Sequence, residues 1–173
     1  MNRPDPDPRG PPIRLLFVCS GNTCRSPLAE VLSRRVGSEV GGPTVEARSA
    51  GTHTRPGLAA SGGALRAARR HGLSLDDHYS SVLSKELVEW ADLIFAMSPD
   101  HLFGLKALGA QGKAFLLGAF ATDEELEGIN GDGDHLAVPD PFGGPDEVYE
   151  ETFFTLEKYV ELAMKRLVGG SGR

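Results

Sequence analysis

The stretch IRLLFVCSGNTCRSPLAE, residues 13–30, constrains the fold of this chain more than any other. Its opening apolar run is typical of a buried strand in a parallel sheet. A loop of small and polar residues follows, after which Ser26 can cap a helix and Pro27 can start it. Leu28 and Leu32 give this helix an apolar inner face. A strand, a tight loop and a helix in this order predict the first unit of an α/β fold.

Apolar runs and helical patterns alternate through the rest of the chain. They predict strands at 44–52, 92–97 and 113–118, and helices at 59–71, 84–90, 99–108 and 148–167. Residues 118–145 are rich in Gly, Asp, Glu and Pro and predict a long functional loop. We therefore expect an α/β fold with three layers, in which helices cover both faces of a four-stranded parallel sheet. Ligands should bind at the carboxyl ends of the strands, where Cys19 lies.

The chain of 173 residues is long enough for one domain with a hydrophobic core. We place that domain at 13–168. Residues 1–12 lack the pattern of a secretory signal and read as a disordered tail, and 169–173 as a flexible C-terminal tail. No apolar run is long enough to cross a bilayer. We expect a cytoplasmic monomer that does not associate with a membrane.

Charge and cysteine content exclude further classes of protein. The formal net charge of −6 argues against nucleic acid as a partner, because a phosphate backbone is bound by clustered Lys and Arg. Cys19 and Cys24 are the two cysteines of the chain, too few for a disulfide framework. No His or further Cys lies near them, so we expect no zinc site and no other metal centre.

The loop after the first predicted strand has the features of a phosphate-binding loop. Amide groups at a helix N-terminus lack internal partners and bind anions. Gly21 and Asn22 tolerate the left-handed backbone that a nest of amides requires, and Arg25 offers a planar fork to two phosphate oxygens. The predicted phosphate-binding residues are Ser20, Gly21, Asn22, Thr23, Cys24 and Arg25.

A cysteine at the base of this loop is a candidate nucleophile. The amides, the helix end and Arg25 favour the thiolate of Cys19, which is then poised to attack phosphorus. The signature of ATP-binding P-loops, Gly, four residues and Gly-Lys-Ser/Thr, is missing. Attack requires a proton donor for the leaving group, and we choose Asp140 in PDPFGG. Its competitors are Asp123, Asp132, Asp134 and Asp146.

Together, VCSGNTCRSPLAE and DPFGG resemble the low-molecular-weight protein tyrosine phosphatases, specifically their bacterial protein arginine phosphatase branch. The resemblance covers about 13–167 in element order as well as motif. It implies Cys19 as the nucleophile that forms a phosphocysteine, Arg25 as the phosphate clamp, and Asp140 as general acid and later base. It further implies Ser26 as the hydroxyl that hydrogen-bonds the thiolate, and a polar network that supports the loop through Asn22, Ser49 and His78. No metal or organic cofactor is implied.

Two positions distinguish the substrates that the resemblance allows. Tyrosine-directed members commonly carry an apolar residue where this chain has Thr23, and a second aromatic where Gly143 follows Phe142. A hydroxyl can accept a hydrogen bond from a guanidinium, whereas an apolar side chain packs against a ring. Thr23 and Phe142 are therefore the predicted specificity residues. We expect phosphorylated proteins as partners and favour phosphoarginine over the alternative, phosphotyrosine.

Other functions of the same loop are less well supported. A thioredoxin-coupled arsenate reductase would need further cysteines on a mobile segment, and none follows residue 24. A non-catalytic phosphate sensor could dispense with the nucleophile or the acid, and both are present. Cys24 has two interpretations. It is either a small residue under the first helical turn or the partner of Cys19 in a reversible disulfide, and we favour the redox role.

Overall fold

The computed structural model describes residues 9–124 and 133–170 of the chain. A parallel sheet of four strands, in the order β2-β1-β3-β4, forms the centre of the described part. The strands are β1 (Ile13–Cys19), β2 (Val45–Gly51), β3 (Leu93–Ala96) and β4 (Ala114–Leu116). Because all of them run in the same direction, their carboxyl ends share one edge of the sheet.

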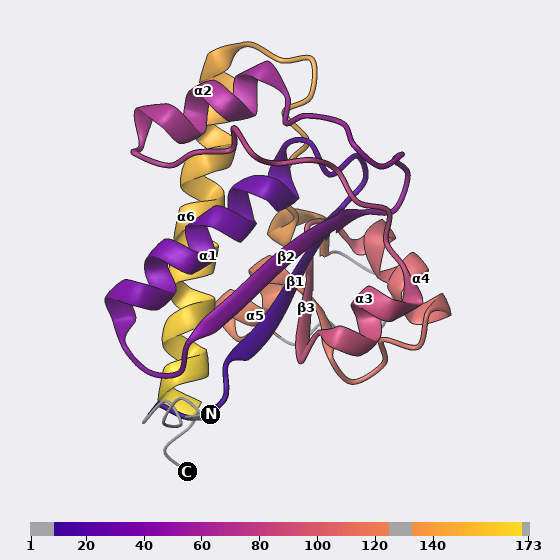
Figure 1. The fold of residues 1–173 in the computed structure, drawn as a ribbon, viewed down its shortest axis with the longest axis vertical. Helices are drawn as coiled ribbons and strands as arrows, with labels where there is room; N and C mark the ends of the chain where they lie inside the picture. Colours follow the sequence, from indigo (N-terminus) through magenta and orange to yellow (C-terminus); the bar gives the residue numbers. More distant parts are fainter. Residues whose placement is uncertain (1–8, 125–132, 171–173) are drawn as a thin grey trace, which may run out of the picture.

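Helices cover both faces of this sheet (Figure 1). Side chains alternate along β1: Leu15 and Phe17 enter a core with α1, α2 and α6, whereas Leu16 and Val18 enter a second core with α3 and α4. This arrangement confirms the predicted three-layer α/β fold. The helices are α1 (Arg25–Val40), α2 (Gly62–Arg70), α3 (Lys85–Trp90), α4 (Pro99–Ala107), α5 (Leu117–Thr122), α6 (Asp146–Gly170) and the 3₁₀ helix η1 (Gly133–Leu136).

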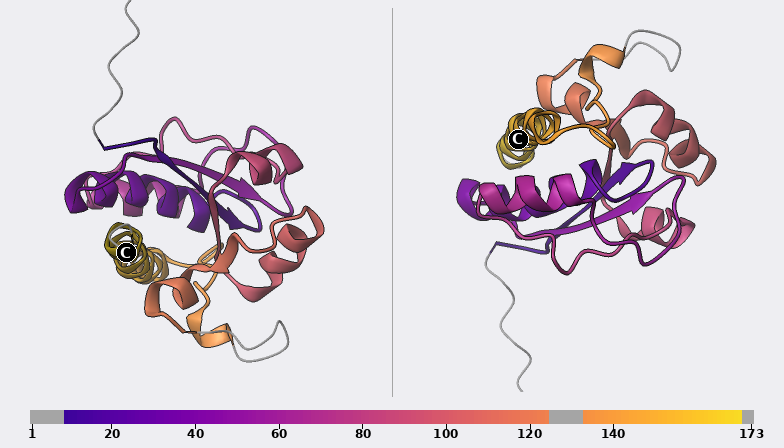
Figure 2. Two further views of the ribbon diagram at one scale, coloured as in Figure 1. Left: turned by 90° about the horizontal axis from the view of Figure 1, so that it is seen from below. Right: turned by 90° about the horizontal axis from the view of Figure 1, so that it is seen from above.

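Local sequence determines where several helices begin. The Ser61 hydroxyl accepts a hydrogen bond from the backbone of Ala64 at the start of α2, and the Ser84 hydroxyl accepts one from Leu87 at the start of α3. Pro99 occupies the first turn of α4, where its missing N–H costs nothing. Helix α1 packs directly against the long helix α6, and the edge-on views of Figure 2 show the two on the same side of the sheet.

The structure corrects the predicted fourth strand. Strand β4 ends at Leu116, and the following residues form α5 instead of continuing the strand to 118. Leu117 is fully buried in the larger core, so this turn of helix contributes to the core. A Cβ on Gly118 would lie 2.2 Å from the Leu136 carbonyl oxygen, and this close contact requires glycine. The predicted loop 118–145 thus contains α5 and η1, and its residues 125–132 lie outside the described part.

The last helix extends beyond the predicted C-terminal bound of the domain at residue 168. Helix α6 continues through Gly170, two residues into the predicted C-terminal tail. Residues 171–173, and residues 1–8 of the predicted N-terminal tail, lie outside the described part. Within the described ranges, no helix combines the length and the apolar character that crossing a membrane demands.

Candidate active site

The loop between β1 and α1 lies at the carboxyl edge of the sheet. Cys19 is the last residue of β1 and is 2% exposed. Asn22 adopts a left-handed backbone with φ of 54°, as the sequence predicted, whereas Gly21 does not use this conformation. Helix α1 begins at Arg25, so Ser26 lies inside its first turn and does not cap it. The predicted N-cap role of Ser26 is therefore wrong.

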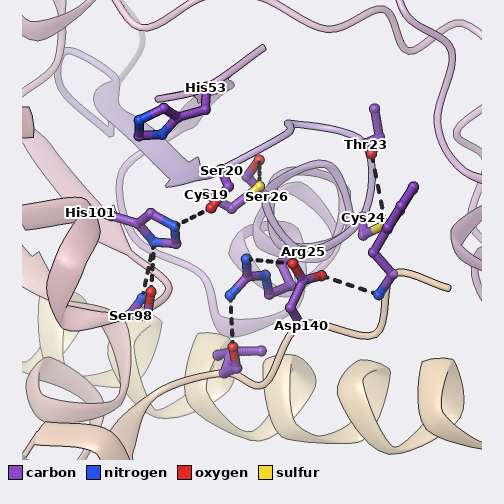
Figure 3. A network of polar contacts seen from close by, with 12 residues as sticks. Cys19, Ser20, Thr23, Cys24, Arg25, Ser26, His53, Ser98, His101 and Asp140 are labelled. Carbon is purple, nitrogen blue, oxygen red and sulfur yellow. Dashed lines mark hydrogen bonds and ion pairs between the residues drawn. The ribbon is translucent and has the colours of Figure 1, made fainter. Parts of the chain in front are cut away.

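The Ser26 side chain instead contacts the Cys19 sulfur. Ser26 Oγ lies 2.9 Å from Cys19 Sγ (Figure 3), and the backbone N–H of Asn22 points at the same sulfur from 3.3 Å. Both groups can donate a hydrogen bond to sulfur. The loop thus places two hydrogen-bond donors beside the candidate nucleophile.

Asn22 holds the loop in shape through its amide and its backbone. Its side-chain Nδ2 donates to Ser26 Oγ at 2.8 Å and to Ser49 Oγ at 2.9 Å. Its Oδ1 accepts the backbone N–H of Ser81 at 2.8 Å, and His78 Nε2 lies 2.7 Å from its carbonyl oxygen. The four residues predicted to support the loop are therefore brought together around one buried amide.

Arg25 connects the loop to the segment that precedes α6. Its side chain is almost completely buried, and its Nη1 donates to the carbonyl oxygen of Val138 at 3.0 Å. Its Nη2 lies 3.3 Å from Asp140 Oδ2. Val138 is held in turn, because its backbone N–H donates to the carbonyl of Met97 at 2.7 Å, next to the end of β3. The long segment thus returns to the strand ends, as the sequence predicted.

Asp140 is half exposed, and its Oδ1 accepts the backbone N–H of Phe142 at 3.1 Å. Two competing acids are paired elsewhere. Asp123 contacts Arg166, and Asp146 contacts Arg66 and Arg70, whose hydrogen bonds lower the pKa of Asp146 from 3.8 to about 2. Asp134 lies in η1, and Asp132 lies outside the described residues.

A cavity of about 480 Å³ opens above Cys19. The loop between β1 and α1 forms its floor. Its walls come from the segment after β2 and from the segment that carries Asp140. The wall residues are His53, Thr54, Arg55, Leu58, Asp140 and Phe142. Thr23 lines one side, and the 72% exposed Phe142 lies at the rim. Both predicted specificity residues therefore face the space that a substrate side chain would enter.

Sequence reasoning missed two groups of residues around this loop. His101 Nε2 lies 2.9 Å from Ser20 Oγ (Figure 3). On the other side, Cys24 Sγ lies 3.0 Å from Ser61 Oγ and 3.6 Å from Tyr149 Oη. One signal was available for His101, which follows the third predicted strand and so had to lie at the edge of the sheet that carries Cys19.

Comparisons with known proteins agree with this geometry. The family model described as low molecular weight phosphotyrosine protein phosphatase matches residues 14–169. A protein-arginine-phosphatase of Bacillus subtilis is 37% identical over 88% of this chain and 95% of its own length. The protein-tyrosine-phosphatase Etp of Escherichia coli is 32% identical over 88% of this chain and 93% of its own.

Among solved structures, the YwlE arginine phosphatase, as a Cys-to-Ser mutant with a phosphorylated active-site serine, superposes with a TM-score of 0.79. It is 35% identical, and the match covers 90% of this chain and 95% of that one. The loop, the sheet and these likenesses together place the chain in the low molecular weight phosphotyrosine protein phosphatase family, as a cysteine-dependent phosphoprotein phosphatase.

Proposed function

We propose that this enzyme hydrolyses phosphoarginine on proteins through a phosphocysteine intermediate, and that residues 13–168 act as one phosphatase domain. The residue that supports this substrate is Thr23, whose half-buried side chain lines the cavity with its Oγ1 3.8 Å from Cys24 Sγ. Its oxygen can accept a hydrogen bond from a guanidinium N–H, which a phenyl ring cannot offer. The arginine phosphatases of Bacillus subtilis and Geobacillus stearothermophilus, 37% and 36% identical, support this choice.

The first chemical step transfers the phosphoryl group to sulfur. The Cys19 thiolate attacks phosphorus while Arg25 and the loop amides bind the equatorial oxygens. An S–P bond forms, the P–N bond to the substrate arginine breaks, and Asp140 gives its proton to the departing nitrogen. The Ser26 hydroxyl, 2.9 Å from the sulfur, stabilises the thiolate before attack.

The second step releases phosphate. Asp140, now a carboxylate, takes a proton from water as the water oxygen attacks the phosphocysteine. The new P–O bond replaces the P–S bond, inorganic phosphate leaves and the thiolate returns. The 3.3 Å contact between Arg25 and Asp140 keeps the acid beside the position where the phosphate binds.

We further propose that Cys24 traps an oxidised Cys19 as a reversible disulfide, and that the enzyme acts in the cytoplasm as a monomer without metal or cofactor. Neither cysteine is in a disulfide in the structure, and both are buried around the same loop. A sulfenic acid on Cys19 would condense with the Cys24 thiol to form the S–S bond and release water.

Phosphotyrosine is the second candidate substrate. Etp supports it, and so does Phe142, an exposed ring at the cavity rim that could stack on a phenyl group. Gly143 follows, with φ of 78°. Because glycine has no side chain, this position offers no second ring to complete a sandwich around the phenyl group. A phenyl ring would therefore be held on one side by Phe142.

The test compares kcat/KM for two peptides of identical sequence that carry phosphoarginine or phosphotyrosine at the same position. A higher value for phosphoarginine is the expected result. A higher value for phosphotyrosine would reverse the substrate assignment, and hydrolysis of neither peptide would contradict the proposed function.

A further inference from the structure

A buried histidine outside the predicted site contacts the phosphate loop. His101 lies in the first turn of α4 and is 2% exposed. Its Nδ1 faces the backbone N–H of Ser98 at 3.2 Å. An amide N–H can only donate, so Nδ1 must accept and carries no proton. In the neutral ring the proton therefore resides on Nε2.

The ring stays neutral at physiological pH. Burial, and after it the neighbouring Arg25 cation, lowers the pKa of His101 from 6.5 to about 4. One tautomer, with hydrogen on Nε2, is thus fixed by the fold and persists through the working range of a cytoplasmic enzyme.

Nε2–H points at the Ser20 hydroxyl. The two atoms are 2.9 Å apart, and Ser20 Oγ must be the acceptor because Nε2 is the donor. The hydroxyl keeps its own proton for another acceptor. Among the described residues no side chain or backbone oxygen takes that proton. Ser20 follows Cys19 directly and lines the same cavity as Arg25, so this proton is free to be donated to a ligand bound there.

Resting on the proposed function, we propose that His101 is a positioning residue which, through Nε2–H, orients the Ser20 hydroxyl to donate to an oxygen of the bound phosphate. The loop then has one side-chain O–H donor in addition to its amides and Arg25. Figure 3 shows His101 between Ser98 and Ser20, on the flank of Cys19 opposite Thr23. A neutral histidine supplies this orientation without placing a second cation beside Arg25.

The test measures the inhibition constant of inorganic phosphate, because phosphate binding does not depend on which phosphoamino acid is the substrate. Ser20→Ala removes the donor, and a hydrogen bond to a charged group is worth roughly 10- to 100-fold in affinity. Phosphate should therefore bind that much more weakly to Ser20→Ala, whereas Ser20→Thr, which keeps the hydroxyl, should restore most of the affinity. Ser38→Ala, an exposed serine on α1, is the matched control and should bind phosphate as the wild type does.

His101 is tested through Ser20. His101→Leu should weaken phosphate binding when Ser20 is present and should add little in the Ser20→Ala background, because the two side chains act as one donor. Unchanged affinity in Ser20→Ala, or losses that simply add in the double variant, would overturn the proposal. If His101→Leu does not fold, the phosphate affinities of Ser20→Ala and Ser20→Thr decide whether the Ser20 hydroxyl donates to phosphate. A wild type that binds phosphate but does not hydrolyse phosphoarginine would count against the proposed function and not against this role.

Discussion

Arg25 Nη2 lies 3.3 Å from Asp140 Oδ2, while Nη1 of the same guanidinium donates to the Val138 carbonyl at 3.0 Å. One side chain of the phosphate loop therefore holds the segment that carries the proposed acid. This contact places the Asp140 carboxylate beside the proposed phosphate clamp.

Asp140→Asn removes the transferable proton but keeps an oxygen for the Phe142 amide, which Oδ1 accepts at 3.1 Å. We expect kcat on a phosphoarginine peptide to fall by roughly 10²- to 10⁴-fold, the usual contribution of a general acid. p-Nitrophenyl phosphate has a good leaving group that needs less help from an acid. Its rate of phosphoryl transfer to the enzyme, measured as the burst of nitrophenol, should therefore fall less in this variant. A variant with full kcat on the peptide would require another acid.

Thr23→Ile replaces the proposed guanidinium acceptor with an apolar side chain. One hydrogen bond contributes about 0.5–1.5 kcal/mol, so the ratio of kcat/KM for phosphoarginine over phosphotyrosine should fall by roughly tenfold. Both peptides are assayed with the same enzyme preparation, so a loss of folded protein affects both values equally. An unchanged ratio would remove Thr23 from the specificity argument.

Cys24→Ser tests the redox proposal. After peroxide, the wild type should recover activity with thiol and show a Cys19–Cys24 link by mass spectrometry. The variant cannot form this link, so its Cys19 should progress to irreversible oxidation. Equal recovery of both proteins would contradict the redox role and leave Cys24 as a packing residue beside Ser61 and Tyr149.

Asp146 gives a pH-dependent prediction. Its carboxylate joins α6 to Arg66 and Arg70 of α2, and these hydrogen bonds lower its pKa from 3.8 to about 2. A pKa that is lowered in the folded state stabilises the protein at pH values above 3.8. This contribution to the free energy of unfolding is lost as the pH falls towards 2. Asp146→Asn should therefore lower Tm at pH 7, and the difference from wild type should shrink between pH 4 and 2.

Glu147→Gln, which also removes one negative charge from the start of α6, is the control for this comparison. Glu147 is exposed, so its replacement should change Tm little at any pH. If Asp146→Asn and wild type differ by the same amount at pH 7 and at pH 2, the ion pairs with α2 do not stabilise the fold.

The part of the site formed by the loop between β1 and α1 could be predicted because its residues are close in sequence. Cys19, Arg25 and Ser26 lie on one strand, loop and helix turn, whose backbone follows from an apolar run, a Gly-Asn loop and Pro27. The end of β4 could not be predicted, because an apolar run such as KAFLLG suits a strand or a buried helix equally. Only the packing of Leu117 against the rest of the core decides between them.

The pair formed by Ser20 and His101 escaped prediction for a different reason. The two residues are 81 positions apart, and their contact depends on β3 lying next to β1 in the sheet. The alternation of strands and helices predicts a parallel sheet but not the order of its strands. The same holds for Cys24 and Tyr149, which meet because α6 returns across α1.

Trapping the phosphoenzyme tests the central claim most directly. Asp140→Ala, which lacks the proposed base for the attack of water, is mixed with p-nitrophenyl phosphate, quenched in acid and digested, and the peptides are analysed by mass spectrometry. The account predicts that one phosphoryl group accumulates on Cys19, and that Cys19→Ala, which has no nucleophile, releases no burst of nitrophenol under the same conditions. Turnover with an unmodified Cys19, or with the phosphoryl group on another residue, would contradict it.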